Sequence, residues 1–289
     1  MKKQEKSSRI SLGTKKKKLV GKIVVFIVLS CISVMMLFPI YIMVVTSLKT
    51  SSEVLAFPPT LIPKKIVFEN FGEVFELLNF ATLYKNSLTI SLLVTLGTVL
   101  SSSFVAFGFY RYKAPGKKAL FIIVLSTMMI PYAAYMIPQF ILFMNISWVN
   151  TFLPLIVPAF FGTAYSIFLF RQFYGTIPYD LFEAARIDGA SEIRCWGMML
   201  RLCGAALAAV AILTFIQSWD DLLGPVIYLS ENDKYTLPIG LSSFRSKFKI
   251  IPWHQIMAAA LMVCIPNLLL FTICQKYFVE GIAFSGLKT

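Results

Sequence analysis

Long apolar runs alternate with short polar segments along the whole chain. A helix needs about 20 predominantly apolar residues to cross the hydrocarbon core of a bilayer, and six runs approach or exceed that length. They cover residues 23–47, 86–109, 119–144, 150–170, 203–228 and 256–274. The pattern predicts an all-α, polytopic membrane protein with about six transmembrane helices.

Charge imbalance between the runs predicts which side of the membrane each polar segment faces. Residues 1–18 hold eight basic residues against one acid, and residues 111–118 hold four basic residues and no acid around a Pro-Gly turn. Basic residues accumulate in cytoplasmic segments, whereas residues 48–83 carry both signs, as outer segments do. We therefore expect a disordered basic cytoplasmic N-terminal tail at 1–18, a transmembrane domain at 19–278 and a cytoplasmic C-terminal tail at 279–289.

The first apolar run, preceded by basic residues, also has the outline of a signal peptide. Residues 23–47 are too long for the apolar region of such a peptide and show no small-residue cleavage site. We expect an uncleaved span, in which Pro39 introduces a kink that neighbouring helices accommodate.

Composition excludes a soluble domain. The chain is 57% hydrophobic and 14% charged, with a mean hydropathy of +0.75, whereas soluble domains carry roughly 25% charged residues. The net charge of +13 raises the question of nucleic acid, but the basic residues lie at the ends of apolar runs, so no nucleic-acid partner is expected. The five cysteines lack metal-ligand spacing, and we expect small buried hydrophobes and no metal site.

The predicted spans contain few ionisable side chains that could take part in catalysis or proton transfer. Asp220 and Asp221, which interrupt the fifth run, are the only acids at membrane depth, and the single histidine, His254, lies outside the spans. A proton-coupled carrier is therefore poorly supported. The chain also lacks the Gly-Lys-Thr phosphate loop, so we expect neither an ATPase site nor a cofactor of its own.

The sequence of the segment 175–196, which we expect to be cytoplasmic, predicts a short helix that could dock on a partner protein. Asp180 followed by Glu183 forms a capping-box pattern that predicts a helix from Leu181. Gly189 is suited to a left-handed C-cap, and Ser191 can start another helix. The result is a helix of about two turns. Its small residues, Ala184, Ala185 and Ala190, favour insertion in a partner's groove. The alternative is a helix resting on lipid headgroups, although such helices usually have a basic face and a bulky apolar face.

At these residues the sequence resembles the permease subunits of bacterial ABC importers, in the carbohydrate-uptake branch that includes the second, maltose-type permease. EAARIDGAS at 183–191 matches the family's cytoplasmic EAA loop. Further matches follow in chain order at Asn86-Ser87-Leu88, residues 128–143, 150–158, 218–229, 235–241 and 275–288. One departure is that residues 195–207 lack the family's Leu-Pro pair before the fifth span and carry Arg201.

The resemblance implies a transport subunit without enzymatic activity, in the bacterial inner or cytoplasmic membrane. Its implied partners are a second permease in a heterodimer, two ATPase subunits that bind ATP and Mg, and an extracellular solute-binding protein. The EAA loop at 175–196 would be the mechanical coupler to the ATPase. By motif match, that role falls on Glu183, Ala184, Ala185, Asp188, Gly189 and Ala190.

The implied cargo is a sugar, and a neutral oligosaccharide fits the spans best. A polyol, glycerol phosphate or uronate is the alternative, although an anionic cargo would require Arg or Lys along the path. An integral membrane enzyme is a second alternative, with Asp220-Asp221 and His254 as its only candidate cluster. Aromatic and polar side chains suited to a sugar path are Tyr132, Tyr135, Gln139, Trp219 and Asp220. Aromatic residues near span ends are equally typical of membrane-interface anchors.

The outer segment 229–254 is much longer than a connector between spans requires. It mixes charges with Tyr235, Phe244, Phe248 and Trp253, a composition typical of a transient protein interface. The resemblance implies docking of the binding protein here, and the alternative is a hydrophilic lid.

Overall fold

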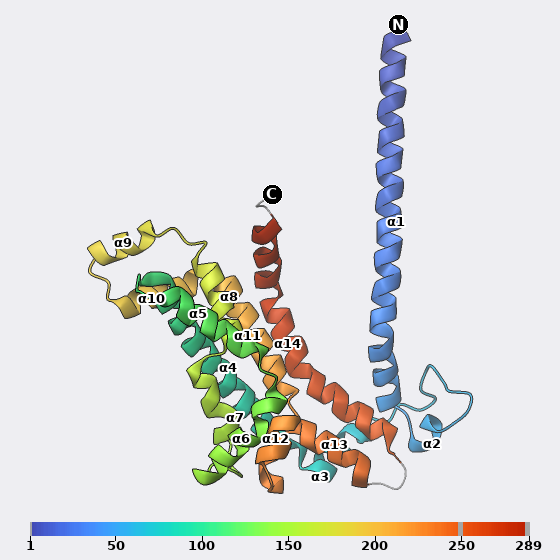
Figure 1. The fold of residues 1–289 in the computed structure, drawn as a ribbon. Coiled ribbons are helices and arrows are strands. Elements are labelled where there is room, and N and C mark those ends of the chain that lie inside the picture. The colour runs from blue at the N-terminus through green and yellow to red at the C-terminus, as the bar shows by residue number, and fades with distance from the viewer. Residues whose placement is uncertain (1, 248–250, 287–289) are drawn as a thin grey trace. The chain divides into compact units, whose positions relative to one another are not determined.

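The computed structural model describes residues 2–247 and 251–286, and the described residues contain helices and no β-strand (Figure 1). The elements are α1 (Lys2–Ser47), α2 (Ser51–Val54), α3 (Glu69–Leu78), α4 (Phe80–Arg111), α5 (Lys117–Ser126), η1 (Thr127–Met129), α6 (Tyr132–Asn145), α7 (Leu153–Ile156), η2 (Val157–Phe161), α8 (Ala164–Tyr174), α9 (Asp180–Ile187), α10 (Glu192–Leu202), α11 (Gly204–Trp219), α12 (Leu223–Tyr228), η3 (Asn232–Lys234), α13 (Leu237–Lys247) and α14 (Trp253–Gly286). The chain forms two compact units, Met1–Gly72 with Pro252–Leu261 and Glu73–Ile251 with Met262–Thr289.

The membrane-spanning helices agree in number with the sequence pattern. Within the described parts of the chain, four helices are long and apolar enough to cross a bilayer by themselves, namely Val20–Ser47, Phe80–Arg111, Leu153–Tyr174 and Trp253–Gln275. Two bent pairs, Lys117–Met129 with Tyr132–Asn145 and Glu192–Leu202 with Gly204–Trp219, bring the number to six if each pair is one span. The all-α polytopic fold class is therefore confirmed.

The third span is broken where the sequence predicts one continuous run. Its two helices meet at an angle of 96°. Ile130 is extended, with φ −83° and ψ 113°, because the ring of Pro131 disfavours helical geometry in the residue before it. α10 and α11 meet at an angle of 80° at Cys203, where the predicted fifth span begins, and α11 then ends at Trp219, where the sequence predicts an interruption.

The N-terminal tail differs from its prediction. Residues 2–18, for which composition predicts disorder, belong to α1, which also continues through Pro39 without ending. Lysine is a good helix former, and a helix that is already nucleated in the apolar span extends at little cost per residue.

α4 is the central helix of the second unit. It packs against α8, η2 and α11, and small side chains on its buried faces allow close approach. A Cβ atom at Gly97 would lie 2.7 Å from the Phe160 ring, so the contact between α4 and η2 requires glycine there. The core of this unit, around Phe107, Phe170 and Tyr174, lies along α4 and extends to α9 and α10.

In the first unit, an internal polar network organises the segment after α1. Asn70 Nδ2 donates to the carbonyl oxygens of Ser47 and Lys49 at 2.8 and 2.9 Å. The buried Glu53 accepts hydrogen bonds from Thr60 Oγ1 at 2.8 Å and from the Lys64 amide at 2.9 Å. The bond from the Lys64 amide is the main reason that the pKa of Glu53 lies below its ordinary value. This segment is thus an ordered loop.

Candidate functional site

Two regions of the second unit have the features of a functional site: the segment around α9 and a cavity among the spans that is lined in part by hydroxyl groups. The first begins where α8 ends at Tyr174 and runs through a loop to α9 (Figure 1). Tyr110 Oη, near the end of α4, donates to the Ile177 carbonyl at 3.0 Å and holds this loop against α4.

The start of α9 corrects the capping-box prediction. The helix begins at Asp180 itself, and the N-cap is Tyr179, whose side chain makes no capping bond. Backbone carbonyls serve instead, because the Leu181 and Phe182 amides donate to Pro178 and Tyr179 at 3.3 and 2.9 Å. Asp180 therefore lies in the first turn, where a carboxylate interacts favourably with the helix dipole.

The end of α9 follows its prediction closely. Gly189 adopts a left-handed conformation with φ +78°. Its amide donates to the Arg186 carbonyl at 3.0 Å, and the Ala190 amide donates to the Ala185 carbonyl at 2.9 Å, which together form a Schellman motif. Ser191 then caps α10, because its Oγ accepts from the Arg194 amide at 3.4 Å.

α9 presents two different faces. Phe182 is fully buried, and Ala185 and Ala190 pack partly buried against the core of the unit. The opposite face is exposed and consists of Leu181, Glu183, Ala184, Ile187 and Asp188. Ile187 is 86% exposed and is the most exposed large apolar side chain of α9. We call these five residues the α9 outer face. Of the matched motif residues, Ala185 and Ala190 thus face the permease core.

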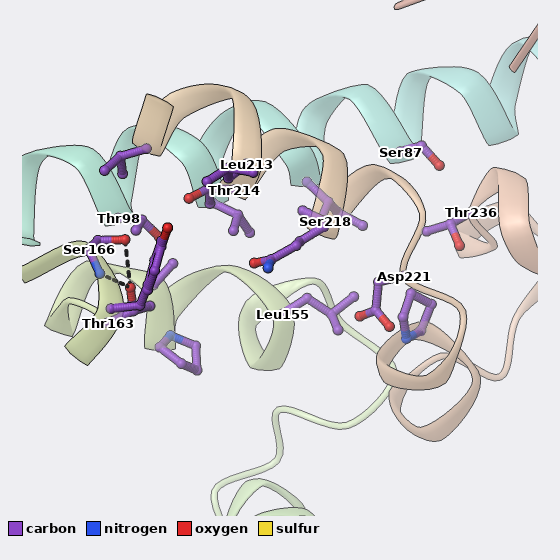
Figure 2. Close-up of a pocket in the computed structure, with 18 of the residues that line it drawn as sticks. Ser87, Thr98, Leu155, Thr163, Ser166, Leu213, Thr214, Ser218, Asp221 and Thr236 are labelled. Atoms are coloured by element: carbon purple, nitrogen blue, oxygen red, sulfur yellow. Dashed lines mark hydrogen bonds between the residues drawn. The ribbon is translucent and has the colours of Figure 1, made fainter. Parts of the chain in front are cut away.

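The second region is a cavity of about 500 Å³ inside the second unit (Figure 2). Hydroxyl side chains from α4, α8, α11 and the segments beside them contribute the main polar groups of an otherwise largely apolar lining. They are Ser87, Thr98, Thr163, Ser166, Thr214, Ser218 and Thr236, together with Tyr135 and Tyr165. Figure 2 shows Asp221 and Thr236 at one end of the cavity and the Thr163–Ser166 pair at the other, where the two hydroxyl oxygens lie 2.8 Å apart.

A smaller cavity of about 290 Å³ adjoins the first and is lined by Tyr132, Gln139 and Tyr228. Asp221 lines both cavities. Its Oδ1 accepts from the Gly224 amide at 3.2 Å, and a Cβ atom at residue 224 would lie 2.5 Å from its Oδ2. Glycine at 224 therefore gives this carboxylate room at the junction of the cavities.

The residues predicted for a sugar path separate into two groups. Tyr135 lines the larger cavity, and Tyr132 and Gln139 line the smaller one. Trp219 and Asp220 line neither of the two. The Trp219 side chain is fully buried, stacks on Phe215 at 5.6 Å and donates from Nε1 to the Val263 carbonyl at 3.0 Å. Its described contacts are those of a packing residue.

Asp221 is the cavity residue that sequence reasoning passed over. The sequence places Asp220 and Asp221 together at membrane depth, but the end of α11 at Trp219 gives the two neighbours different surroundings. The interruption of an apolar run by two acids was the available signal, and only the fold distinguishes which acid faces the cavities.

The segment after α12 is folded onto α4. Asn86 Nδ2 donates to the carbonyl oxygens of Asp233 and Tyr235 at 2.8 and 3.0 Å, and Ser87 Oγ accepts from the Leu237 amide at 2.8 Å. The salt bridge from Lys234 to Glu231, at 2.8 Å, is the main reason that the pKa of Glu231 is lowered. Of the predicted interface residues, Phe248 lies outside the described residues, as does the side chain of Phe244.

These features define a multi-pass membrane permease with a short helix, α9, outside its spans and a hydroxyl-bearing cavity among them. Residues 94–283 match the family described as the binding-protein-dependent transport system inner membrane component, and the chain belongs to this family. Membership implies a partner ATPase and a solute-binding protein.

Relatives and a solved structure agree with this assignment. The chain is 34% identical over 255 residues to the arabinooligosaccharides transport system permease protein AraQ of Halalkalibacterium halodurans, covering 87% of this chain and 91% of the relative. It is 30% identical over 259 residues to the sn-glycerol-3-phosphate transport system permease protein UgpE of Yersinia pestis, covering 87% and 92%. A bacterial ABC transporter involved in the import of the acidic polysaccharide alginate shares the fold, with a TM-score of 0.80, 22% identity and coverage of 90% of this chain and 96% of that one. The protein is therefore a permease subunit of a sugar importer and not an enzyme.

Proposed function

We propose that this chain is one of two dissimilar permeases that together translocate a neutral oligosaccharide into the cell by alternating access. Two partner ATPase subunits would bind ATP and Mg, and one of them would dock on the α9 outer face. An extracellular solute-binding protein would deliver the sugar. In this scheme the chain binds no cofactor of its own, and the two cavities form its part of the sugar path.

The side chains that line the larger cavity are the observation that favours a neutral cargo. Hydroxyls and the Gln217 amide can exchange hydrogen bonds with sugar hydroxyls, and Asp221 can accept them. Among the described residues that line either cavity, none carries a positive charge. A phosphate or uronate would therefore meet Asp221 with no compensating cation, and like-charge repulsion would oppose its passage. The cavity thus fits the cargo named for AraQ better than the one named for UgpE.

Replacing Asp221 with Asn should lower uptake of a neutral oligosaccharide by about tenfold or more, because a hydrogen bond to a charged group contributes about 1.5–3 kcal/mol. Uptake would be measured in vesicles that contain the complete importer. The matched control is Asp220→Asn, which changes the neighbouring acid outside the two cavities. A neutral cargo also predicts that neutral oligosaccharides compete for uptake and that glycerol phosphate and uronates do not. Efficient competition by an anionic sugar would contradict the proposal.

The same scheme requires both termini on the cytoplasmic side. In a cysteine-free variant, single cysteines at Phe57 and Asn232 should react with a membrane-impermeant maleimide applied from outside, because both side chains are exposed. A cysteine at Lys113, which is also exposed but lies in the basic segment 111–118, should react only after the membrane is opened. Labelling of position 113 in sealed cells would reverse the proposed orientation.

A further inference from the structure

Arg111, the last residue of α4, lies against both α9 and α10. Its guanidinium carbon lies 5.5 Å from the Tyr179 ring centroid and 5.8 Å from that of Phe182. Nη1 donates a hydrogen bond to Tyr179 Oη, and Nε lies 3.6 Å from Glu192 Oε2. The side chain is only 11% exposed, so its charge depends on these partners for stabilisation.

Phe182 forms the apolar half of the same contact. Its ring is fully buried between α9 and α4, with centroids 5.7 Å from Phe107 and 5.9 Å from Tyr110. Arg111 covers this aromatic group from the side of the α4 terminus. A planar guanidinium can stack on rings and donate hydrogen bonds in fixed directions, which a lysine ammonium cannot do in the same way.

The position of this contact matters for transmission of movement. α9 has eight residues and is joined to α8 and α10 by loops, so its backbone connections alone leave it free to pivot. α4 runs from this contact to the larger cavity, where it contributes Ser87, Ile90 and Thr98. A helix transmits displacement along its length, whereas a loop absorbs it.

We infer that Arg111, Tyr179, Phe182 and Glu192 form a clamp that makes α9 and the cytoplasmic end of α4 move together, so that displacement of α9 reaches the cavity through α4. The inference rests on the proposed docking of the ATPase on the α9 outer face. The four residues are positioning residues, because none of them belongs to the α9 outer face. Arg111, which ends α4, lies beside Tyr179 and Phe182 at the start of α9. Its guanidinium also pairs with Glu192 at the start of α10. Arg111 acts through Tyr179 and Phe182.

If the clamp is weakened, we expect ATP hydrolysis to drive less sugar transport. In Arg111→Gln importers reconstituted in vesicles, sugar transported per ATP hydrolysed should fall roughly two- to thirtyfold, while ATPase subunits still co-purify with the permeases. Arg111→Lys should restore part of the loss, since it keeps the charge but not the planar stacking. Tyr179→Phe keeps the ring beneath Arg111 and removes the hydroxyl, so it should give a smaller loss. Combined with Arg111→Gln it should add nothing, because both changes remove the same contact.

The control is Lys113→Gln, which removes an exposed basic residue two positions further along the chain. All ratios are measured per assembled complex, so partial misfolding of Arg111→Gln does not affect them. A normal ratio in both Arg111→Gln and Tyr179→Phe overturns the clamp, as does a loss in Lys113→Gln equal to that in Arg111→Gln. Ile187→Glu tests the underlying docking separately. If this variant recovers ATPase subunits as well as the parent does, the proposed docking face is wrong whatever the clamp variants show.

Discussion

Gly189→Val should abolish sugar uptake while leaving the chain inserted in the membrane. Gly189 closes α9 in a left-handed conformation with φ +78°, and an L-residue there costs about 1–2 kcal/mol, more for a β-branched side chain. A Cβ atom at this position would meet nothing within 4 Å, so the expected damage comes from the backbone and not from a clash. Loss of the left-handed turn removes both bonds of the Schellman motif and redirects the chain between α9 and α10.

Two further variants separate the effect of backbone conformation at residue 189 from the effect of adding a larger side chain. Gly197→Val is the matched control, because a Cβ atom there also meets nothing within 4 Å but the residue lies inside α10. Gly189→Asn should retain much of the activity, since asparagine tolerates the left-handed region. Uptake and recovery of ATPase subunits would be measured for each variant, together with Asp188→Lys, which reverses a charge on the α9 outer face. Normal uptake and normal recovery in both Gly189→Val and Asp188→Lys would remove the coupling role from this segment.

The sequence predicted those features of the fold that depend on local chemistry. Apolar length identified the spans, and a glycine after a short amphipathic run identified the left-handed end of α9. The bend before Pro131 was also readable, since a residue before proline avoids helical geometry, but the surrounding apolar run concealed it. The capping box at Asp180 failed because carbonyls from the Pro178–Tyr179 turn already accept the bonds from the first free amides.

The site was less predictable because its parts are distant in the sequence. The hydroxyls of the larger cavity lie between residues 87 and 236, and only the packing of α4 against α8 and α11 brings them together. Orientation was the second obstacle. Trp219 has suitable sugar-binding chemistry, yet its ring packs in the core, while the neighbouring acid Asp221 reaches both cavities. The clamp was not predictable either, because Arg111 has the position of an ordinary positive-inside residue.

The second large expected effect concerns the segment 229–254, and the structure indicates which part of this segment can be replaced. Its first part belongs to the core, because Leu237 and Ile239 are buried and a Cβ atom at Gly240 would lie 2.2 Å from Leu83. A linker that removed these residues would damage α4 packing. The part from residue 242 to 249 begins at the exposed Ser242 and contains two of the four aromatic residues and three of the four lysine and arginine residues of the segment.

Replacing residues 242–249 with a Gly/Ser linker of equal length should therefore preserve assembly and basal ATP hydrolysis but lose stimulation of hydrolysis by the loaded binding protein. Aromatic side chains supply contact area in a transient interface, and basic residues steer encounter. A second variant that changes only Arg245, Lys247 and Lys249 to Ser separates the contribution of charge from that of the aromatic contact area. It should retain the maximal stimulation but require more binding protein, with a weaker dependence on salt. Stimulation would be titrated in reconstituted vesicles at two ionic strengths. If the linker variant responds like the parent, the segment is only a lid, and docking must involve residues 48–83 or the partner permease.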